Sequence, residues 1–172
     1  MFIQRILIIG SPGSGKSRLS VLLGTKLNLP VVHLDKLFWL DGWTMRDKEE
    51  FDGLLLKELE KDKWIIDGNF KRTLELRLKY ADKVILLNYP SFVCRLRVLK
   101  RIVFNRRKTR PDMANNCPER YDRKFMQYVK AFKKESLPEI KQILQEEGAN
   151  VIEITNDRQL KLFLQNVNTY KN

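Results

Sequence analysis

A glycine-rich segment near the amino terminus, Gly10–Ser17, matches the pattern G-x-x-x-x-G-K-[ST] in full. Glycines there allow backbone conformations and close approaches that side chains would block, so successive N–H groups point inward and form an anion nest. In such a loop the lysine reaches the β- and γ-phosphates of a nucleotide, and the final hydroxyl ligates Mg²⁺. We therefore predict a site for ATP and Mg²⁺, with Ser17 as a metal ligand, at Gly10, Ser11, Pro12, Gly13, Ser14, Gly15, Lys16, Ser17 and Arg18.

Two aspartates that follow apolar runs are candidates for chemistry beside this loop. Asp67 ends the run that begins at Trp64, and Asp35 ends the run that begins at Val31. The carboxyl ends of parallel strands open on one crevice, so Asp67 is placed to hold Mg²⁺ and Asp35 to orient or deprotonate an acceptor hydroxyl. Both also have a structural interpretation, as a turn residue before glycine for Asp67 and as a turn or capping residue for Asp35.

Other residues of chemical interest have plainer expectations. His33 is the sole histidine, and we expect it to be a hydrogen-bonded structural residue. Trp39 and Trp43 either wall an acceptor pocket or belong to the core, and the core is the commoner place for such residues. Cys94 and Cys117 form no C-x-x-C pair and are predicted to be reduced thiols, so a structural zinc site is not expected.

Basic residues are concentrated between Arg95 and Lys134, where 14 basic and three acidic side chains give +11 of the net +12. Such a field attracts phosphates, whether on a nucleotide or on a nucleic acid. Phosphoryl transfer places charge on the oxygens of the moving group, and arginines on a closing lid stabilise that charge. We predict a mobile lid at about 106–118, with a phosphate contact from at least one of Arg101, Arg106, Arg107, Arg110 and Arg123. Of these, Arg101, Arg110 and Arg123 are the catalytic candidates, together with Lys16, Asp35 and Asp67.

The framework for these residues follows from the spacing of apolar residues. Apolar runs alternate with amphipathic stretches, which predicts an α/β fold with a parallel sheet covered by helices on both faces. The expected strands are 2–9, 31–34, 64–67, 83–88 and 151–154. The expected helices are 16–27, a helix capped by Asp47, 73–80, a helix capped by Ser91 that runs to about 105, 119–147 with a kink or break at Pro138, and 158–167. No linker divides the chain, so residues 1–172 are expected to form a single domain.

Composition and length limit the class of protein. The chain has 172 residues, of which 43% are apolar and 31% are charged, as in soluble globular proteins. No apolar run approaches the roughly 20 residues that span a bilayer. The first apolar run leads directly into the glycine loop and is interpreted as a buried strand, not as a signal peptide. A cytoplasmic location without a membrane partner is therefore the default expectation.

Taken together, the motifs resemble adenylate-kinase-like and shikimate-kinase-like P-loop kinases, and more closely the bacterial DNA topology modulation proteins of that superfamily. The matching stretches are 8–17, 33–35 with Trp39 and Trp43, 64–69, 108–113 and 117–119. The resemblance implies a three-layer P-loop NTPase sandwich whose five-stranded parallel sheet has the order 2-3-1-4-5. It also implies an acceptor region after the second strand and an arginine-bearing lid.

The same resemblance bears on the two aspartates. Asp67 and Gly68 match the Asp-Gly that lies near the metal in nucleoside monophosphate kinases, and Asp35 falls where shikimate-type kinases place a substrate-binding acid. In the former kinases the motif continues to a substrate-binding arginine. Here the arginine is out of register, at Arg72, which argues against a nucleoside monophosphate as acceptor. By analogy with the fold, 155–157 is expected to lie over the nucleotide base.

Two functions are compatible with these features. The first is an ATP-dependent phosphotransferase that acts on a small acceptor, as a monomer or homodimer. The second is a nucleotide-dependent, DNA-binding regulatory protein, suggested by the basic segment and by the resemblance. No helix-turn-helix or other DNA-reading motif is visible, so the kinase is favoured and a nucleic acid partner is not.

Overall fold

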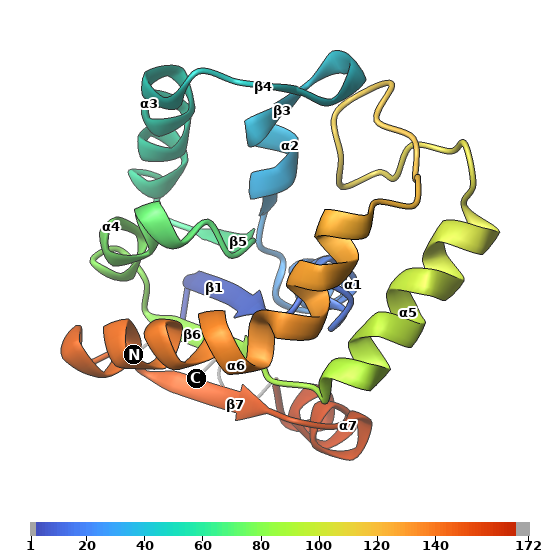
Figure 1. Ribbon diagram of the computed structural model, residues 1–172. Coiled ribbons are helices and arrows are strands. Elements are labelled where there is room, and N and C mark those ends of the chain that lie inside the picture. Colours follow the sequence, from blue (N-terminus) through green and yellow to red (C-terminus); the bar gives the residue numbers. More distant parts are fainter. Residues whose placement is uncertain (1–2, 168–172) are drawn as a thin grey trace.

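A five-stranded parallel sheet forms the centre of the computed structural model, which describes residues 3–167 (Figure 1). Its strands are β1 (Arg5–Gly10), β2 (Val31–His33), β5 (Trp64–Asp67), β6 (Lys83–Leu87) and β7 (Val151–Ile154). They lie in the order β2-β5-β1-β6-β7. Numbered among themselves along the chain, these strands have the order 2-3-1-4-5, so the predicted topology is confirmed.

The three central strands are apolar because both of their faces are covered. In β1 every residue from Ile6 to Gly10 is buried, and β5 is buried throughout. Such continuous apolar runs are typical of parallel strands between two helical layers. Ile8 is paired with Asp67, and Gly10 is paired with Leu87. This register brings the glycine loop and the ends of both neighbouring strands to one edge of the sheet.

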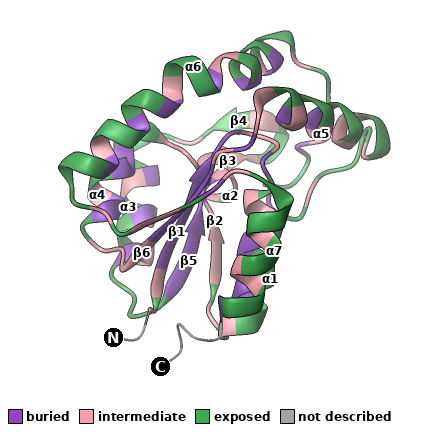
Figure 2. Ribbon diagram, turned by 90° about the horizontal axis from the view of Figure 1, so that it is seen from below, coloured by how far each residue is buried: buried purple, intermediate pink, exposed green. Residues whose placement is uncertain are grey.

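Helices cover both faces of this sheet (Figure 2). One apolar cluster joins the sheet to α3 (Lys48–Leu59), α4 (Leu74–Leu78) and the part of α6 (Arg123–Glu146) from Phe132 onward. The other joins it to α1 (Lys16–Leu27), α5 (Ser91–Phe104), α7 (Asp157–Asn166) and the first half of α6. Helix α6 therefore contributes to both clusters. None of the described helices is long and apolar enough to cross a membrane.

The chain between β2 and α3 differs from the expectation. The second strand ends at His33, and a short helix, α2 (Leu34–Phe38), follows at once. A two-stranded hairpin comes next, β3 (Trp39–Leu40) and β4 (Thr44–Met45), joined by the 3₁₀ turn η1 (Asp41–Trp43). Asp35 consequently lies in the first turn of α2 and not at the end of a strand.

Helix boundaries confirm some of the predicted caps and correct others. The side chain of Asp47 accepts hydrogen bonds from the N–H groups of Glu49 and Glu50 and so caps α3 as predicted. Ser91 is the first residue of α5 and not its cap, because the cap position belongs to Pro90. A further 3₁₀ turn, η2 (Lys71–Thr73), precedes α4.

The long helix near the carboxyl end starts later than predicted, at Arg123, because residues 119–122 are extended or irregular. It passes through Pro138 without interruption and changes direction along its length (Figure 1). The alternative of a break at this proline is therefore wrong. A bend is the usual result where proline removes one backbone hydrogen bond inside a helix.

Candidate active site

The glycine loop between β1 and α1 is packed so tightly that side chains do not fit at two of its positions. A Cβ atom at Gly10 would lie 2.3 Å from the carbonyl oxygen of Leu87, and one at Gly13 would lie 2.5 Å from that of Cys94. Both glycines also have positive φ angles, 143° and 80°. The end of β6 and the first turn of α5 therefore pack directly against the loop, which limits the directions that its N–H groups can take.

The loop leaves polar groups available to an anion. Gly15 has a left-handed conformation before α1, and no side chain caps this helix, so its first N–H groups remain free for a ligand. The Oγ atom of Ser14 is buried and has no hydrogen-bond partner within residues 3–167. A buried hydroxyl without a partner calls for a ligand or water. These features fit the phosphate groups of a nucleotide.

Lys16 lies over this loop and is held by it. Its Nζ atom donates to the carbonyl oxygens of Gly10, at 2.9 Å, and Ser11, at 3.1 Å. Burial lowers the pKa of Lys16, although the carboxylates of Asp35 and Asp67 act in the opposite direction. A lysine ammonium whose partners are only carbonyl groups is ready to exchange them for phosphate oxygens, which carry full negative charge.

Asp67 lies at the end of β5 beside the loop and is 4% exposed. Its Oδ2 atom accepts hydrogen bonds from the hydroxyl of Ser20 and from Nδ1 of His33, the latter at 2.7 Å. Burial alone would lower the pKa of His33, but the hydrogen bond and charge of Asp67 raise it. His33 is thus a hydrogen-bonded residue, as expected, and its partner is the predicted metal ligand.

The donor set beside the loop suits Mg²⁺. Ser17 and Asp67 border the same cleft, and hydroxyl and carboxylate oxygens are ligands that this ion prefers. Within the described chain no group of three or more His, Cys, Asp or Glu side chains is arranged to hold a metal. Mg²⁺ in phosphotransfer sites usually takes one or two carboxylates together with substrate phosphates, so Ser17 and Asp67 fit that role.

A cleft of about 1210 Å³ begins at the loop and extends between α2 and the segment 106–118. Asp35 borders it, although it lies on a helix and not at a strand end. Burial raises the pKa of Asp35, and the charges of Lys16 and Arg110 counteract part of that effect. Trp39 and Trp43 also border the cleft, so they belong to its wall and not to the main core.

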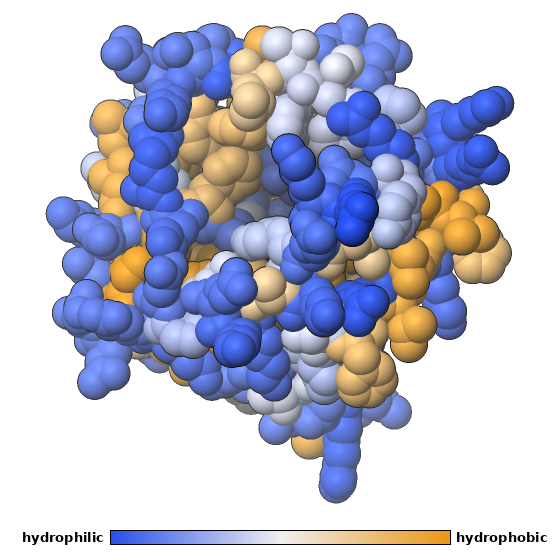
Figure 3. Space-filling model, in the orientation of Figure 1, coloured by the Kyte–Doolittle hydropathy of each residue, from blue (hydrophilic) through white to orange (hydrophobic). Residues whose placement is uncertain are grey.

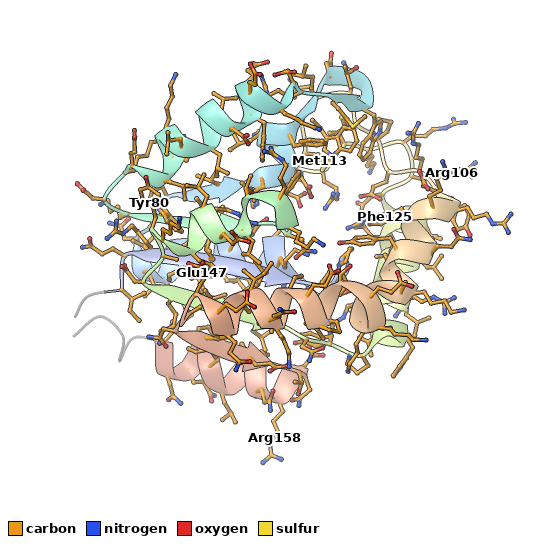
Figure 4. The ribbon with its side chains drawn as sticks, turned by 60° about the vertical axis from the view of Figure 1, so that its left-hand side comes forward. Tyr80, Arg106, Met113, Phe125, Glu147 and Arg158 are labelled. Carbon is orange, nitrogen blue, oxygen red and sulfur yellow. The ribbon has the colours of Figure 1, made fainter. Side chains whose placement is uncertain are left out.

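The predicted lid arginines divide into two groups. Arg101 and Arg110 border the cleft, and both contact Oε1 of Glu119, at 3.0 Å and 2.6 Å. Arg110 also pairs with Asp112 at 2.8 Å. The others, Arg106, Arg107 and Arg123, are exposed and do not border the cleft, and Arg106 lies at the edge of the molecule (Figure 4).

At the other end of the cleft, α5 and α7 meet. Arg97 pairs with Asp157 at 2.8 Å, and its guanidinium lies 4.5 Å from the ring centre of Tyr89. Arg18, Arg97 and Asp157 all border the cleft. Asp157 belongs to the segment 155–157 that we expected near the base.

Sequence reasoning missed two side chains that shape the site. Oδ1 of Asn69 accepts a hydrogen bond from the N–H of Gly10 at 3.0 Å and joins the segment after β5 to the glycine loop. Arg77 is fully buried and donates to the carbonyl oxygens of Gly68, Asn69 and Phe70, at 3.0, 2.6 and 2.9 Å. Burial lowers the pKa of Arg77 to about 9, so it remains a cation at neutral pH. No sequence pattern marks Arg77, whereas Asn69 ends the recognised stretch 64–69, although no role was assigned to it.

Comparisons with known proteins give a result at the level of the fold. No protein family profile matches the chain, and no curated protein matches it. Solved structures do match. A shikimate kinase from Acinetobacter baumannii, in complex with shikimate, has a TM-score of 0.60 and 16% identity over 97% of this chain and 93% of that one.

Two further structures agree over almost the full length. A shikimate kinase from Bacteroides thetaiotaomicron has a TM-score of 0.56 and 19% identity, with 97% of both chains covered. A Chloroflexus aurantiacus protein described as a candidate kinase has a TM-score of 0.56 and 18% identity, with 99% of both chains covered. The chain therefore has the α/β fold of shikimate-kinase-like P-loop proteins.

Proposed function

We propose that the protein is an ATP-dependent phosphotransferase that moves the γ-phosphate of ATP to a hydroxyl group of a small acceptor. The observation that carries this proposal is that one cleft joins the phosphate-binding loop to Asp35 on one side and to Arg101 and Arg110 on the other. The likeness in fold to kinases supports it. A site that only stored a nucleotide would need no second compartment beside the γ-phosphate.

The residues of the loop bind and orient the nucleotide. The free N–H groups at the start of α1 and the ammonium of Lys16 hold the β- and γ-phosphates, for which Lys16 leaves the carbonyl groups of Gly10 and Ser11. Ser17 and Asp67 would hold Mg²⁺, which offsets phosphate charge when it is bound. Ser20 and His33 keep the Asp67 carboxylate in place through its Oδ2 atom.

Two residues that border the cleft beyond the loop would contact the acceptor and the transferring phosphoryl group. Asp35 accepts the proton of the acceptor hydroxyl, or orients that hydroxyl, as the hydroxyl oxygen attacks. Arg101 lies on α5, where it borders the cleft next to the loop, and its positive charge stabilises the negative charge on the transferring phosphoryl group. Most of the rate enhancement in such reactions comes from positioning and charge stabilisation.

Transfer of label from γ-³²P-ATP tests this proposal. The protein is incubated with pooled nucleosides, nucleotides, sugars and hydroxy acids, and the products are separated by chromatography. We expect one pool to be labelled by the wild type and by the exposed-lysine control Lys57→Ala, and label to fall by about 10²-fold or more in Lys16→Ala. Absence of a labelled product from every pool would contradict the proposal.

The alternative of a DNA-binding regulatory protein, as in DNA topology modulation, has less support. Part of the basic segment faces buried carboxylates of the cleft, since Arg101 and Arg110 pair with Glu119. The exposed lysines on α6 remain available to nucleic acid: Lys124, Lys130, Lys133 and Lys134. A gel-shift titration in salt separates the two functions. Tight binding to duplex DNA that falls steeply with salt and is lost on charge reversal of these lysines would favour the alternative.

A further inference from the structure

One wall of the acceptor end of the cleft is aromatic. Phe38, Trp39, Trp43 and Phe70 border the cleft, and each is partly exposed. Phe38 stands at the centre of the group, with ring centroids 5.0 Å from both Trp39 and Phe70. The buried ring of Phe51 packs behind Phe38 and Phe70 and supports them. A fixed aromatic wall of this kind favours a ligand with a flat face.

The hollow is visible near the centre of the face shown in Figure 3, with hydrophobic surface along the side nearer α3 and hydrophilic surface opposite. Asp35 shares α2 with Phe38, so a carboxylate lies on the same short helix as the aromatic wall. A ligand packed on the rings would therefore have a carboxylate close by that can accept a hydrogen bond from the ligand's O–H group. This is the arrangement that phosphorylation of a ring-bearing alcohol requires.

Trp43 is fixed in the wall from behind. Its backbone N–H donates to Sγ of Cys117 at 3.3 Å, and the thiol in turn contacts the carbonyl oxygen of Leu40 at 3.5 Å. The indole Nε1 atom is buried and has no hydrogen-bond partner within the described residues. A buried donor without an acceptor is rare.

On the opposite wall, two of the arginines that border the cleft already contact buried carboxylates. Arg110 lies between Asp112 and Glu119, and Arg101 shares Glu119. Both carboxylates are buried, each 8% exposed. An anionic acceptor would have to draw these arginines away and leave a buried carboxylate without its partner, which is unfavourable. A further arginine, Arg120, is exposed and lies 5.5 Å from the ring centre of Trp43.

We propose that the acceptor is an uncharged alcohol carrying a planar ring, of the nucleoside type, and not a phosphorylated or carboxylated compound. The ring packs on the wall formed by Phe38, Trp39, Trp43 and Phe70, and the hydroxyl that receives the phosphoryl group faces Asp35. In the transfer the acceptor O–H bond and the bond from the γ-phosphorus to the bridging oxygen break, a new P–O bond forms, ADP leaves, and the proton passes to Asp35. This inference rests on the proposed phosphotransferase function.

Equilibrium binding separates this inference from the reaction itself. Nucleosides, their 5′-monophosphates and shikimate are titrated into protein saturated with Mg²⁺ and a non-hydrolysable ATP analogue, and tryptophan fluorescence is recorded. Trp39 and Trp43 report on the cleft, whereas Trp64 is fully buried in the core. We expect at least one nucleoside to bind about tenfold or more tightly than its monophosphate and than shikimate. Tighter binding of a monophosphate or of shikimate, or no nucleoside binding at all, would overturn the inference.

A charge variant sharpens the test. Glu119→Gln removes the carboxylate that Arg101 and Arg110 share while keeping its shape, so we expect the preference for a nucleoside over its monophosphate to shrink by about tenfold. Glu135→Gln, at an exposed position of α6, is the matched control and should keep the preference. An unchanged preference in a folded Glu119→Gln protein would show that these arginines do not exclude anions. If the ATP analogue binds but anions are preferred, only this inference fails, whereas failure of ATP binding also removes the proposed function.

Discussion

Burial shifts the pKa values of two residues that border the cleft, Lys16 and Asp35. Lys16 and Asp35 are both half-buried in the cleft, and burial acts on each in the direction that disfavours its charge: it lowers the pKa of the lysine and raises that of the aspartate. The two opposite charges compensate each other in part. Phosphate groups of a bound nucleotide would compete with Asp35 for the positive charge of Lys16. Binding of the nucleotide is therefore coupled electrostatically to the charge of Asp35, the residue proposed to contact the acceptor.

The protonation of Asp35 should determine how kcat/KM depends on pH in the acid range. Its pKa is raised by burial, so the carboxylate loses its charge at a higher pH than an exposed aspartate does. We expect kcat/KM to fall as the pH is lowered through this raised pKa, because the protonated acid cannot accept the hydroxyl proton. Asp35→Asn should lower kcat by about 10²–10⁴-fold and remove this limb of the profile. A control, exposed Asp62→Asn, should keep it; an acid limb that survives in Asp35→Asn would exclude Asp35 as the base.

The sequence allowed some residues of the candidate site to be predicted and not others. The loop residues, Ser17 and Asp67 could be placed at the site because their motifs fix their position relative to a strand. Arg123, a catalytic candidate from the sequence, is exposed and does not border the cleft, and charge alone does not show which way a side chain turns. The neutralising role of Glu119 was not foreseen, because pairs such as Arg101 with Glu119 form only when the chain is folded.

At the scale of elements, the glycine loop and α5 form one packed unit. A Cβ at Gly13 would lie 2.5 Å from the carbonyl oxygen of Cys94 and 2.8 Å from Cγ2 of Val98, both on α5. The loop therefore depends for its shape on a helix that follows it by about 80 residues in the chain. Sequence patterns give each element by itself and do not show this close approach.

Alanine at Gly13 tests this contact. Because the added methyl group meets α5 and the φ angle is positive, we expect Gly13→Ala to lower the free energy of unfolding by about 1–3 kcal/mol and to weaken nucleotide binding. Gly53, inside α3, has no atom within 4 Å of an added Cβ, so Gly53→Ala should raise the free energy of unfolding by about 0.5–1 kcal/mol. Urea denaturation measures both, and equal effects of the two variants would refute close packing of the loop.

Secondary structure followed the apolar pattern well in some elements that flank the glycine loop or pair with its strand. The strand Trp64–Asp67 and the helix Lys16–Leu27 have the predicted bounds. Prediction failed where tertiary contacts decide. Helix α2 replaces the end of the second strand, and α6 starts at Arg123, after its cap Asp122, while Glu119 contacts arginines of the preceding helix and loop.

At the scale of the whole molecule, the cleft exists because the sheet brings its carboxyl ends to one edge. The loop after β1 supplies the phosphate site, and the chain after β2 supplies Asp35 with three rings of the aromatic wall. The segment after β5 supplies the fourth ring, Phe70, and α5 with the following segment supplies the arginines. Ligands of open parallel sheets bind at this edge. The sheet order was implied by the resemblance to P-loop kinases. Two rings of the aromatic wall, Trp39 and Trp43, depend on the hairpin β3–β4, whose strands have two residues each and leave no periodic signal.

Isothermal titration calorimetry with Mg·ATP tests the central claim, that the loop around Lys16 holds a triphosphate. The account predicts one binding site per chain for the wild type, and an affinity lower by about tenfold or more in Lys16→Ala, which loses a charge-assisted contact to phosphate. The same affinity in Lys16→Ala and in the wild type, or no binding of Mg·ATP by the folded wild type, would contradict it.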